Sequence, residues 1–343
     1  MTARTSIKRA VAWSLLRSGA LSVHRRLLQR AKAIVLLYHR VNDEGDPFFP
    51  SLPVRHFRDQ LEHVARHYRI EPLEAVLDWL AAGAPGPARV ALTIDDGYPD
   101  TGEAVLPILE RLGLPATLFL CTGPPESGQP LWIDRVRALI KHARATALRF
   151  PALGEGDLAL DSAGARLLAS TRLVACMKHL PPPEIARGLA TLEERLEPGP
   201  FSLRVIGWDD VRRLAKGPVA LGAHTHNHYL LSTLDDAEVA SEISTSLELI
   251  QRRAGVSART FAYPNGEPGD YDERSVAVLR RLGVRCALTT RHGFARNAQD
   301  PYEIARIYTT EAFLPLFAAR ISGLGLEERW ESMNRPSRMV MAE

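Results

Sequence analysis

The stretch "RVALTIDDG" (residues 89–97) decides the fold class, because a continuous apolar run ends directly in two carboxylates and a glycine. Apolar residues on both faces of such a run are typical of a parallel strand that is covered on both sides. Adjacent carboxylates repel each other, so holding Asp95 and Asp96 together favours a cation or a shared proton. Ligands bind at the carboxyl ends of parallel strands, and we therefore expect a functional site here rather than a surface turn.

Outward from this strand, helical and buried apolar segments alternate. This alternation predicts a parallel α/β fold, and the number of units favours a distorted, closed or nearly closed β/α barrel over an open sheet. The predicted strands are residues 33–39, 89–94, 115–120, 219–223, 260–263 and 285–290. The predicted helices are residues 53–68, 72–83, 101–113, 209–217, 236–255 and 273–283.

The domain boundaries follow from where this rhythm starts, breaks and stops. Residues 33–310 form the predicted barrel domain, and residues 124–207 interrupt it as an inserted helical segment. Residues 1–32 are a separate basic segment, and residues 311–343 are a predicted C-terminal helical tail.

A second polar cluster, "LGAHTHNHYLLS" (residues 221–232), begins at the end of another predicted strand. His224 and His228 lie four apart in a turn and can converge on one ion, whereas His226 points elsewhere. A solvated loop would explain these histidines alone, but not the matching acid pair at residues 95–96. Two histidines and one carboxylate predict a catalytic type of zinc site with open coordination positions.

The N-terminal segment carries an unusual charge. Residues 1–40 contain nine basic and no acidic residues, while the whole chain has a net charge of +3. Apolar residues recur at helical spacing, which predicts a basic amphipathic helix that either contacts an anionic membrane through residues 1–30 or caps the domain. The recurring residues are Val11, Leu15, Leu16, Ala20, Val23 and Leu27. Nucleic acid is not an expected partner, because the rest of the chain is acidic.

The cysteines and the apolar runs bear on the compartment. Three scattered cysteines offer neither a disulfide framework nor a thiolate zinc site. The run "VAWSLL" is closed by Arg17 and makes a poor signal peptide. These features predict a cytoplasmic protein, with membrane association as a further alternative.

The motifs "LTIDDG" and "HTHNH" together resemble the polysaccharide deacetylase family of metal-dependent carbohydrate esterases. The resemblance covers residues 33–310 and implies a distorted β/α barrel. It implies Asp95 as the catalytic base and a divalent ion, with Zn²⁺ as the expected metal, on Asp96, His224 and His228.

The third family motif, Arg-x-Pro-Tyr, is altered in this chain. The segment "FAYPNG" (residues 261–266) takes its place, with Ala262 for the arginine and Asn265 for the tyrosine. Tyr263, Pro264 and Asn265 are then the expected substrate-binding residues. The arginine that orients the aspartate in the family either has a substitute elsewhere in the chain, with Arg306 and Arg40 as the candidates, or is missing.

The fifth family motif, Leu-x-His, is missing near the end of the chain. The segment "LYH" (residues 37–39) has this pattern at the end of the first strand. A circularly permuted barrel would bring His39 to the site as the general acid, and the alternative is the late His292. Tyr263, Trp132 and Tyr98 are candidates for stacking on a sugar, with packing as the other explanation.

The resemblance implies a metal-dependent hydrolase that removes N-acetyl groups from the amino sugars of a glycan. Two alternatives remain at this point. The substrate could be a lipid-linked sugar, deacetylated or deformylated at the cytoplasmic membrane face. The protein could also be a catalytically silent, metal-containing glycan-binding protein, because the family's usual arginine is absent.

Overall fold

The computed structural model describes residues 3–21, 32–154, 156–297 and 299–324. Within them, seven parallel strands close a barrel in the order β1-β10-β9-β8-β7-β4-β3, and β3 pairs with β1 to complete the ring. The prediction of a distorted β/α barrel is confirmed. The barrel strands are β1 (Ala33–Tyr38), β3 (Arg89–Asp96), β4 (Ala116–Leu120), β7 (Val219–Ala223), β8 (Thr260–Ala262), β9 (Cys286–His292) and β10 (Ile304–Tyr308).

The strands follow one another around the ring in chain order, so the first and last strands are neighbours. Leu36 and Leu37 of β1 pair with Ile307 and Tyr308 of β10. The two-residue strand β2 (Arg69–Ile70) extends the sheet beside β3. The sequence analysis did not identify β10, because Arg306 interrupts its short apolar run.

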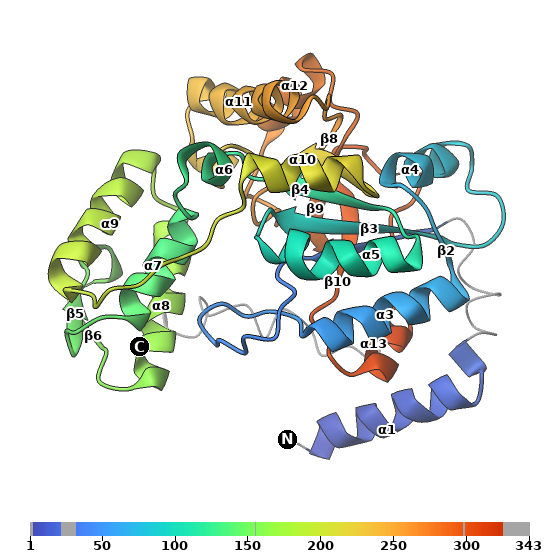
Figure 1. Ribbon diagram of the computed structural model, residues 1–343, viewed down its shortest axis with the longest axis horizontal. Helices are drawn as coiled ribbons and strands as arrows, with labels where there is room; N and C mark the ends of the chain where they lie inside the picture. Colours follow the sequence, from blue (N-terminus) through green and yellow to red (C-terminus); the bar gives the residue numbers. More distant parts are fainter. Residues whose placement is uncertain (1–2, 22–31, 155, 298, 325–343) are drawn as a thin grey trace.

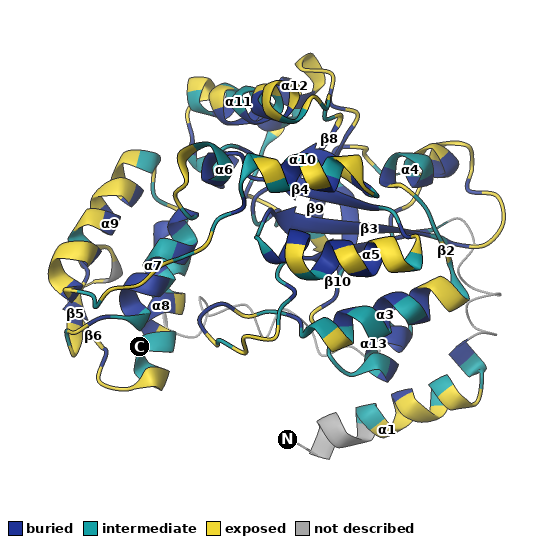
Figure 2. Ribbon diagram, viewed as in Figure 1, coloured by how far each residue is buried: buried dark blue, intermediate teal, exposed yellow. Residues whose placement is uncertain are grey.

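Helices cover the outside of the barrel, with their buried faces toward the strands (Figures 1 and 2). The predicted helix 101–113 begins instead as a π-helical turn at Thr101–Val105. The remaining barrel helices and the flanking ones are α1 (Ala3–Arg17), α3 (Val54–His67), α4 (Leu73–Ala81), α5 (Leu106–Leu112), α10 (Trp208–Lys216), α11 (Asp236–Ala254), α12 (Glu273–Arg281) and α13 (Leu314–Ile321).

Successive residues of the strands serve two different apolar clusters, as the alternation of side chains along a strand requires. In β1, Ile34 and Leu36 belong to the cluster beneath the helices, whereas Val35 belongs to a second cluster with Phe119 of β4. Gly222 of β7 leaves room for that phenylalanine, because a Cβ at position 222 would lie 2.5 Å from its ring. The inside of the barrel is therefore packed, and its polar groups are gathered near the carboxyl ends of the strands.

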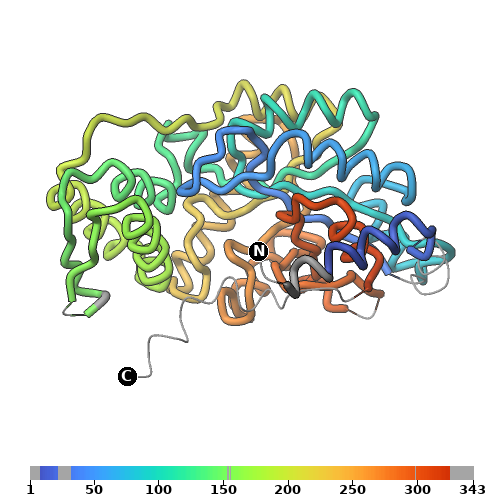
Figure 3. The backbone as a smooth tube through the Cα atoms, turned by 90° about the horizontal axis from the view of Figure 1, so that it is seen from below, coloured from blue at the N-terminus to red at the C-terminus, as the bar shows by residue number. Residues whose placement is uncertain are grey.

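A lobe with its own apolar cluster lies at one end of the molecule (Figures 1 and 3). The chain enters it after β4 and returns to the barrel at α10. The lobe and its entry comprise α6 (Gly123–Ser127), α7 (Trp132–Lys141), β5 (Ala147–Arg149), β6 (Asp157–Ala159), α8 (Ala163–Met177) and α9 (Pro182–Leu196).

Helix α1 packs beside α13, and the Arg9 guanidinium lies over the Phe313 ring at 4.5 Å. Its burial does not follow the predicted apolar stripe, because Val11 is exposed and Ala12 is buried. Val23 and Leu27 of that stripe lie outside the described residues, as does most of the predicted tail 311–343 beyond α13. None of the described helices has both the length and the apolar character needed to cross a membrane.

Candidate active site

A buried ion pair lies at the carboxyl end of the barrel. Arg306 of β10 donates from Nη1 and Nη2 to the two carboxylate oxygens of Asp95, each at 2.8 Å. The arginine side chain is fully buried and that of Asp95 nearly so. Arg306 Nε also donates to the Thr289 carbonyl at 2.8 Å, so the guanidinium is held from two sides. Such bidentate pairs fix geometry as well as charge.

Arg306 therefore makes the contact with Asp95 that is expected of a substitute for the missing arginine of the third family motif. The other candidate, Arg40, points elsewhere: its Nη2 lies 2.8 Å from Asp134 Oδ2 of α7, and its guanidinium lies 3.5 Å from the centre of the Tyr98 ring. Tyr98 thus packs under Arg40, which leaves little of that ring face for a sugar.

Next to this pair, three potential ligands converge. Asp96 Oδ1 lies 3.4 Å from Nε2 of His224 and 3.4 Å from Nε2 of His228. His224 Nδ1 lies 2.7 Å from the Ala262 carbonyl oxygen. Because a carbonyl oxygen only accepts hydrogen bonds, Nδ1 carries the proton, and the lone pair of Nε2 is left for a metal ion. A metal-binding histidine is commonly held by such a second hydrogen bond.

The residue types and burial fit a divalent metal ion. All three side chains are buried, and Asp96 Oδ1 has no hydrogen-bond donor among the residues that the structure describes. An orphaned buried carboxylate oxygen is costly unless something charged binds it. Asp96, His224 and His228 are the residues that would hold the ion, and an Asp-His-His set is of the kind that leaves coordination positions open.

The backbone around these ligands is strained. Asp96, Thr225 and His228 have φ angles of 75°, 62° and 61°, a region that residues other than glycine rarely adopt. Such conformations persist only where surrounding contacts enforce them, and they concentrate at functional sites.

The contacts that enforce the loop come largely from Glu242 of α11. Its carboxylate accepts hydrogen bonds from the backbone N–H groups of His226 and Asn227 at 3.0 and 2.8 Å, and from the Asn227 side chain at 2.7 Å. Thr225 Oγ1 accepts from the His228 backbone N–H at 3.0 Å. The sequence analysis did not identify Glu242. Its place beside Val239 and Ile243 on the apolar face of the predicted helix could have indicated a buried charge with a specific partner.

His226 does not join the cluster. Its Nδ1 lies 2.9 Å from Thr122 Oγ1, and the ring is half-buried on that side of the loop. The structure thus separates the three histidines as the sequence analysis expected, with His224 and His228 facing Asp96.

The candidate acid His39 follows β1 directly. Its half-buried ring packs against Tyr308 at 5.6 Å between centroids. Burial lowers the pKa of His39, and the nearby charges of Asp96 and Asp95 offset only part of that effect. His292 is the exposed last residue of β9, whose backbone pairs with Arg306.

Asp100 fixes the chain just beyond His39. Its Oδ2 accepts from the Val41 backbone N–H and from Asn42 Nδ2, each at 3.0 Å. Burial, only partly opposed by the Asn42 hydrogen bond, raises the pKa of Asp100 to about 6. The last acid of "DDGYPD" is therefore a positioning group for the loop after β1.

The altered third motif contributes backbone rather than exposed rings. Tyr263 is fully buried and stacks on Tyr271 at 3.9 Å, which favours packing, the alternative named for this ring, over stacking on a sugar. Pro264 is also buried, whereas Asn265 is half-buried with a φ of 55°. Ala262 supplies the carbonyl that orients His224.

The charges of the site follow from these contacts. Burial acts to raise the pKa of Asp95, but the charge and hydrogen bonds of Arg306, together with the charges of His224 and His39, outweigh it, so that pKa lies below its ordinary range. Burial lowers the pKa of His228 to about 4. Burial acts to lower the pKa of His224, but the charges of Asp96 and Asp95 and the hydrogen bonds to Asp96 and to the Ala262 carbonyl together outweigh it and raise that pKa. Asp95 is therefore ionised and His228 neutral at pH 7, the states that a general base and a metal ligand require.

Three comparisons relate this chain to known proteins. The sequence model of the family described as "Polysaccharide deacetylase" matches residues 82–287. The protein YxkH of Bacillus subtilis (strain 168), which carries a polysaccharide deacetylase name, is 20% identical over 279 residues, or 81% of this chain and 71% of YxkH.

Two solved structures share the fold. The deacetylase PplD of Streptococcus pyogenes, solved in complex with acetate, is 17% identical with a TM-score of 0.55, over 82% of this chain and 93% of PplD. IcaB of Ammonifex degensii is 19% identical with a TM-score of 0.54, over 86% of this chain and 98% of IcaB.

The first prediction concerns the metal. Asp96→Ala and His228→Ala should each remove the bound ion, because each deletes a ligand from a set of three. His226→Ala is the matched control and should keep about one ion per chain, since its ring faces Thr122. Elemental analysis of the purified variants measures this. Full metal content in His228→Ala would contradict the assignment.

Proposed function

This chain belongs to the polysaccharide deacetylase family of hydrolases, which cleave the amide bonds of N-acetyl groups on amino sugars, and we propose that it does so at the Asp95–Arg306 pair and the adjacent Asp-His-His cluster. The bidentate contact between Arg306 and Asp95 carries this proposal. An ionised, rigidly held carboxylate beside a metal-binding set is what amide hydrolysis needs. The same contact argues against a catalytically silent binding protein, the alternative that the missing family arginine had suggested.

Each group has a distinct part in the proposed reaction. Asp96, His224 and His228 would hold a divalent ion, with Zn²⁺ as the expected metal, and the bound ion would supply Lewis-acid chemistry for the acetyl carbonyl. Asp95 accepts a proton from the attacking water, and Arg306 keeps that carboxylate ionised and aimed. His39, in its charged form, donates a proton to the leaving amine, which is a poor leaving group without it.

A second proposal concerns the N-terminus. We infer that α1 contacts an anionic membrane surface, because its outer face combines an exposed aromatic ring with positive charge. Trp13 is 49% exposed and Val11 41% exposed, and the Arg17 guanidinium lies 4.5 Å from the centre of the Trp13 ring. Tryptophan and basic residues are enriched where a helix lies in the membrane interface. Such contact would place the active site near a lipid-linked glycan at the membrane surface, the alternative substrate named above.

The second prediction concerns the ion pair. Arg306→Leu should lower the free energy of unfolding by about 3–5 kcal/mol, because it leaves a buried carboxylate unpaired. Removing the arginine removes the largest influence that opposes burial at Asp95, so the pKa of Asp95 rises and the acid limb of the rate profile moves to higher pH. Denaturation and pH–rate curves measure the two effects. Arg291→Leu, at an exposed pair with Glu303, should change stability by less than about 1 kcal/mol. An unmoved acid limb in folded Arg306→Leu would refute this role.

The third prediction concerns the proton donor. His39→Ala should keep its metal but slow amide hydrolysis by about 10²–10⁴-fold, the usual contribution of one acid–base group. An activated aryl acetate needs no proton on its leaving group and should be affected much less. Activity needs the charged imidazole, so it falls as pH rises through the His39 pKa, and this limb should vanish in the variant. If His292→Ala instead shows the amide-selective defect, the acid comes from the end of β9.

The fourth prediction concerns the membrane. Flotation with vesicles that contain acidic lipid should recover the full chain, and recovery should fall with salt and on deletion of residues 1–30. Each basic residue near the surface contributes about 1 kcal/mol to such binding. Trp13→Ala tests the aromatic contact, and Phe201→Ala, an exposed aromatic of the lobe, is its control. Recovery that is independent of lipid charge would eliminate the proposal.

A further inference from the structure

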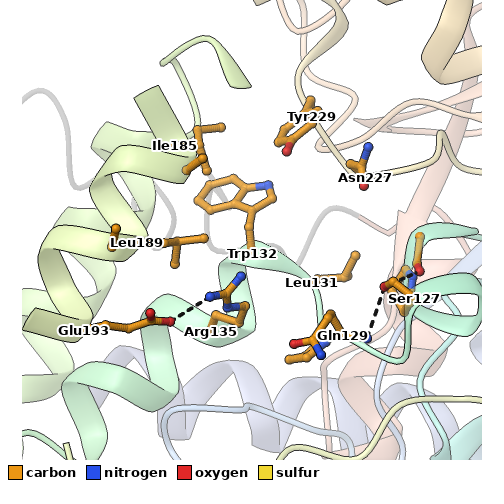
Figure 4. Close-up of a pocket in the computed structure, with 15 residues that line it drawn as sticks. Ser127, Gln129, Leu131, Trp132, Arg135, Ile185, Leu189, Glu193, Asn227 and Tyr229 are labelled. Atoms are coloured by element: carbon orange, nitrogen blue, oxygen red, sulfur yellow. Dashed lines mark hydrogen bonds and ion pairs between the residues drawn. The ribbon is translucent and has the colours of Figure 1, made fainter. Parts of the chain in front are cut away.

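Helix α7 presents two nearby arginines to different surroundings. Arg135 and Trp132 line a pocket between α7 and α9, where Arg135 Nη2 lies 2.7 Å from Glu193 Oε1 (Figure 4). Arg137 follows two residues later, and side chains two apart on a helix point to nearly opposite sides. The charge of Arg135 is therefore paired within the lobe, whereas Arg137 faces another part of the molecule.

The part that Arg137 faces is the carboxyl end of β1. Asp134 shares a side of α7 with Arg137, because residues three apart on a helix are neighbours. Asp134 Oδ2 lies 2.8 Å from Nη2 of Arg40, the residue that directly follows the candidate acid His39. Arg137 Nη1 lies 3.6 Å from the other oxygen of the Asp134 carboxylate. This side of α7 therefore carries Asp134 and Arg137 together toward the end of β1.

The guanidinium of Arg137 is available to a ligand. Its 3.6 Å separation from Asp134 Oδ1 is too long for a hydrogen bond, and that oxygen has no hydrogen-bond partner among the described residues. Arg40 instead makes the hydrogen bond to Asp134, and its guanidinium is covered by the Tyr98 ring. The Arg137 side chain is 29% exposed, so a molecule in the solvent can reach it.

The electrostatics of Tyr308 also place Arg137 near the site. Tyr308 is the last residue of β10, and its ring packs against the candidate acid. Burial raises the pKa of Tyr308 to about 12, and the charges of Asp96 and Asp95 act in the same direction. The positive charges of Arg306 and Arg137 oppose that rise. Arg137 is therefore close enough to the end of β10 for its charge to act there.

The charges around this point do not balance when the metal site is filled. Asp95 is matched by Arg306, and Asp134 is matched by Arg40. A divalent ion would bring two positive charges to the single carboxylate of the Asp-His-His cluster. Together with Arg137, the filled site would leave two positive charges unmatched among these groups. A phosphate monoester carries about −1.5 to −2 charges at pH 7, and its oxygens match the fork of a guanidinium.

We propose that Arg137 binds a phosphate group on the amino sugar whose acetyl group is removed, and so selects a phosphorylated sugar over a neutral one. The proposal rests on the proposed function, which supplies the amino sugar, and deepens it by naming the charge of the substrate. The leaving amine must lie at the candidate acid, and a phosphate on the neighbouring carbon of the same sugar lies beside that amine. Arg137, on the helix face that looks at the end of β1, is placed to contact it.

The test compares two sugars that differ only in the group on C1. Calorimetry on the metal-loaded full chain measures the affinities for N-acetylglucosamine 1-phosphate and for the methyl glycoside of N-acetylglucosamine. The wild type should prefer the phosphate by at least about tenfold, or 1.4 kcal/mol, and the preference should fall with salt because Arg137 is partly exposed.

Three variants assign this preference to one side chain. Arg137→Gln should lose it, and Arg137→Lys should keep part of it, because lysine retains the charge without the planar fork. Arg135→Gln is the matched control on the same helix and should keep the whole preference, since Arg135 is paired with Glu193. Circular dichroism verifies that each variant is folded.

A further probe separates the two sources of such a phosphate. N-acetylglucosamine joined through a diphosphate to a short polyprenol, in detergent micelles, should bind more tightly than the 1-phosphate if the substrate is lipid-linked, and equally if it is a free sugar phosphate. Either result supports the phosphate site, provided that Arg137→Gln weakens the binding.

The failure of this proposal differs from the failure of the proposed function. Turnover of an uncharged aryl acetate by the wild type tests the proposed function alone, and its absence would count against that function while calorimetry still judges the phosphate site. Equal wild-type affinities for the phosphorylated and the neutral sugar would overturn the phosphate site. A full preference for the phosphate in folded Arg137→Gln would overturn it as well, because the metal alone would then explain the selectivity.

Discussion

The ion pair between Asp95 and Arg306 is the interaction on which the site depends. The two residues come from β3 and β10, which are the neighbours of β1 on its two sides. The pair therefore connects an early strand to the last strand at the place where the barrel closes. Thr93 adds to this link, because its hydroxyl donates to the Leu36 carbonyl of β1 at 2.7 Å. A buried pair contributes little net stability, but losing one partner is costly. The pair therefore makes the correct closure of the ring and the ionised state of Asp95 depend on each other.

The metal-ligand cluster is built against local preference. Asp96, Thr225 and His228 adopt left-handed backbone conformations, and Asp96 Oδ1 is buried without a donor from the described residues. The network around Glu242 and the packing of β3 against β4 hold this arrangement in place. An ion that binds there relieves the electrostatic part of the cost, so metal binding and folding of the loop favour each other.

The sequence predicted most of the barrel because its buried strands are uninterrupted apolar runs with helices between them. It also predicted which two histidines face the carboxylate, since the spacing of residues 224 and 228 and the strand ends determine this. It did not predict β10, because the functional Arg306 breaks the apolar pattern that identifies a strand. It left the ring of Tyr263 as a candidate either for stacking on a sugar or for packing, and the stacking on Tyr271, eight residues away, favours packing. Such pairings depend on tertiary contacts that periodicity does not encode.

Helix α7 joins the lobe to two loops of the site. Trp132 on its first turn donates to the His228 carbonyl, and Asp134, two residues later, pairs with Arg40, the neighbour of His39. Asp134 is buried, so that ion pair is screened little by solvent. The loop that bears His228 and the loop that bears the candidate acid are thus both fixed to one rigid element of the lobe. A displacement of α7 would move both loops together, which makes the lobe a supporting part of the active site and not only an addition to the barrel's surface.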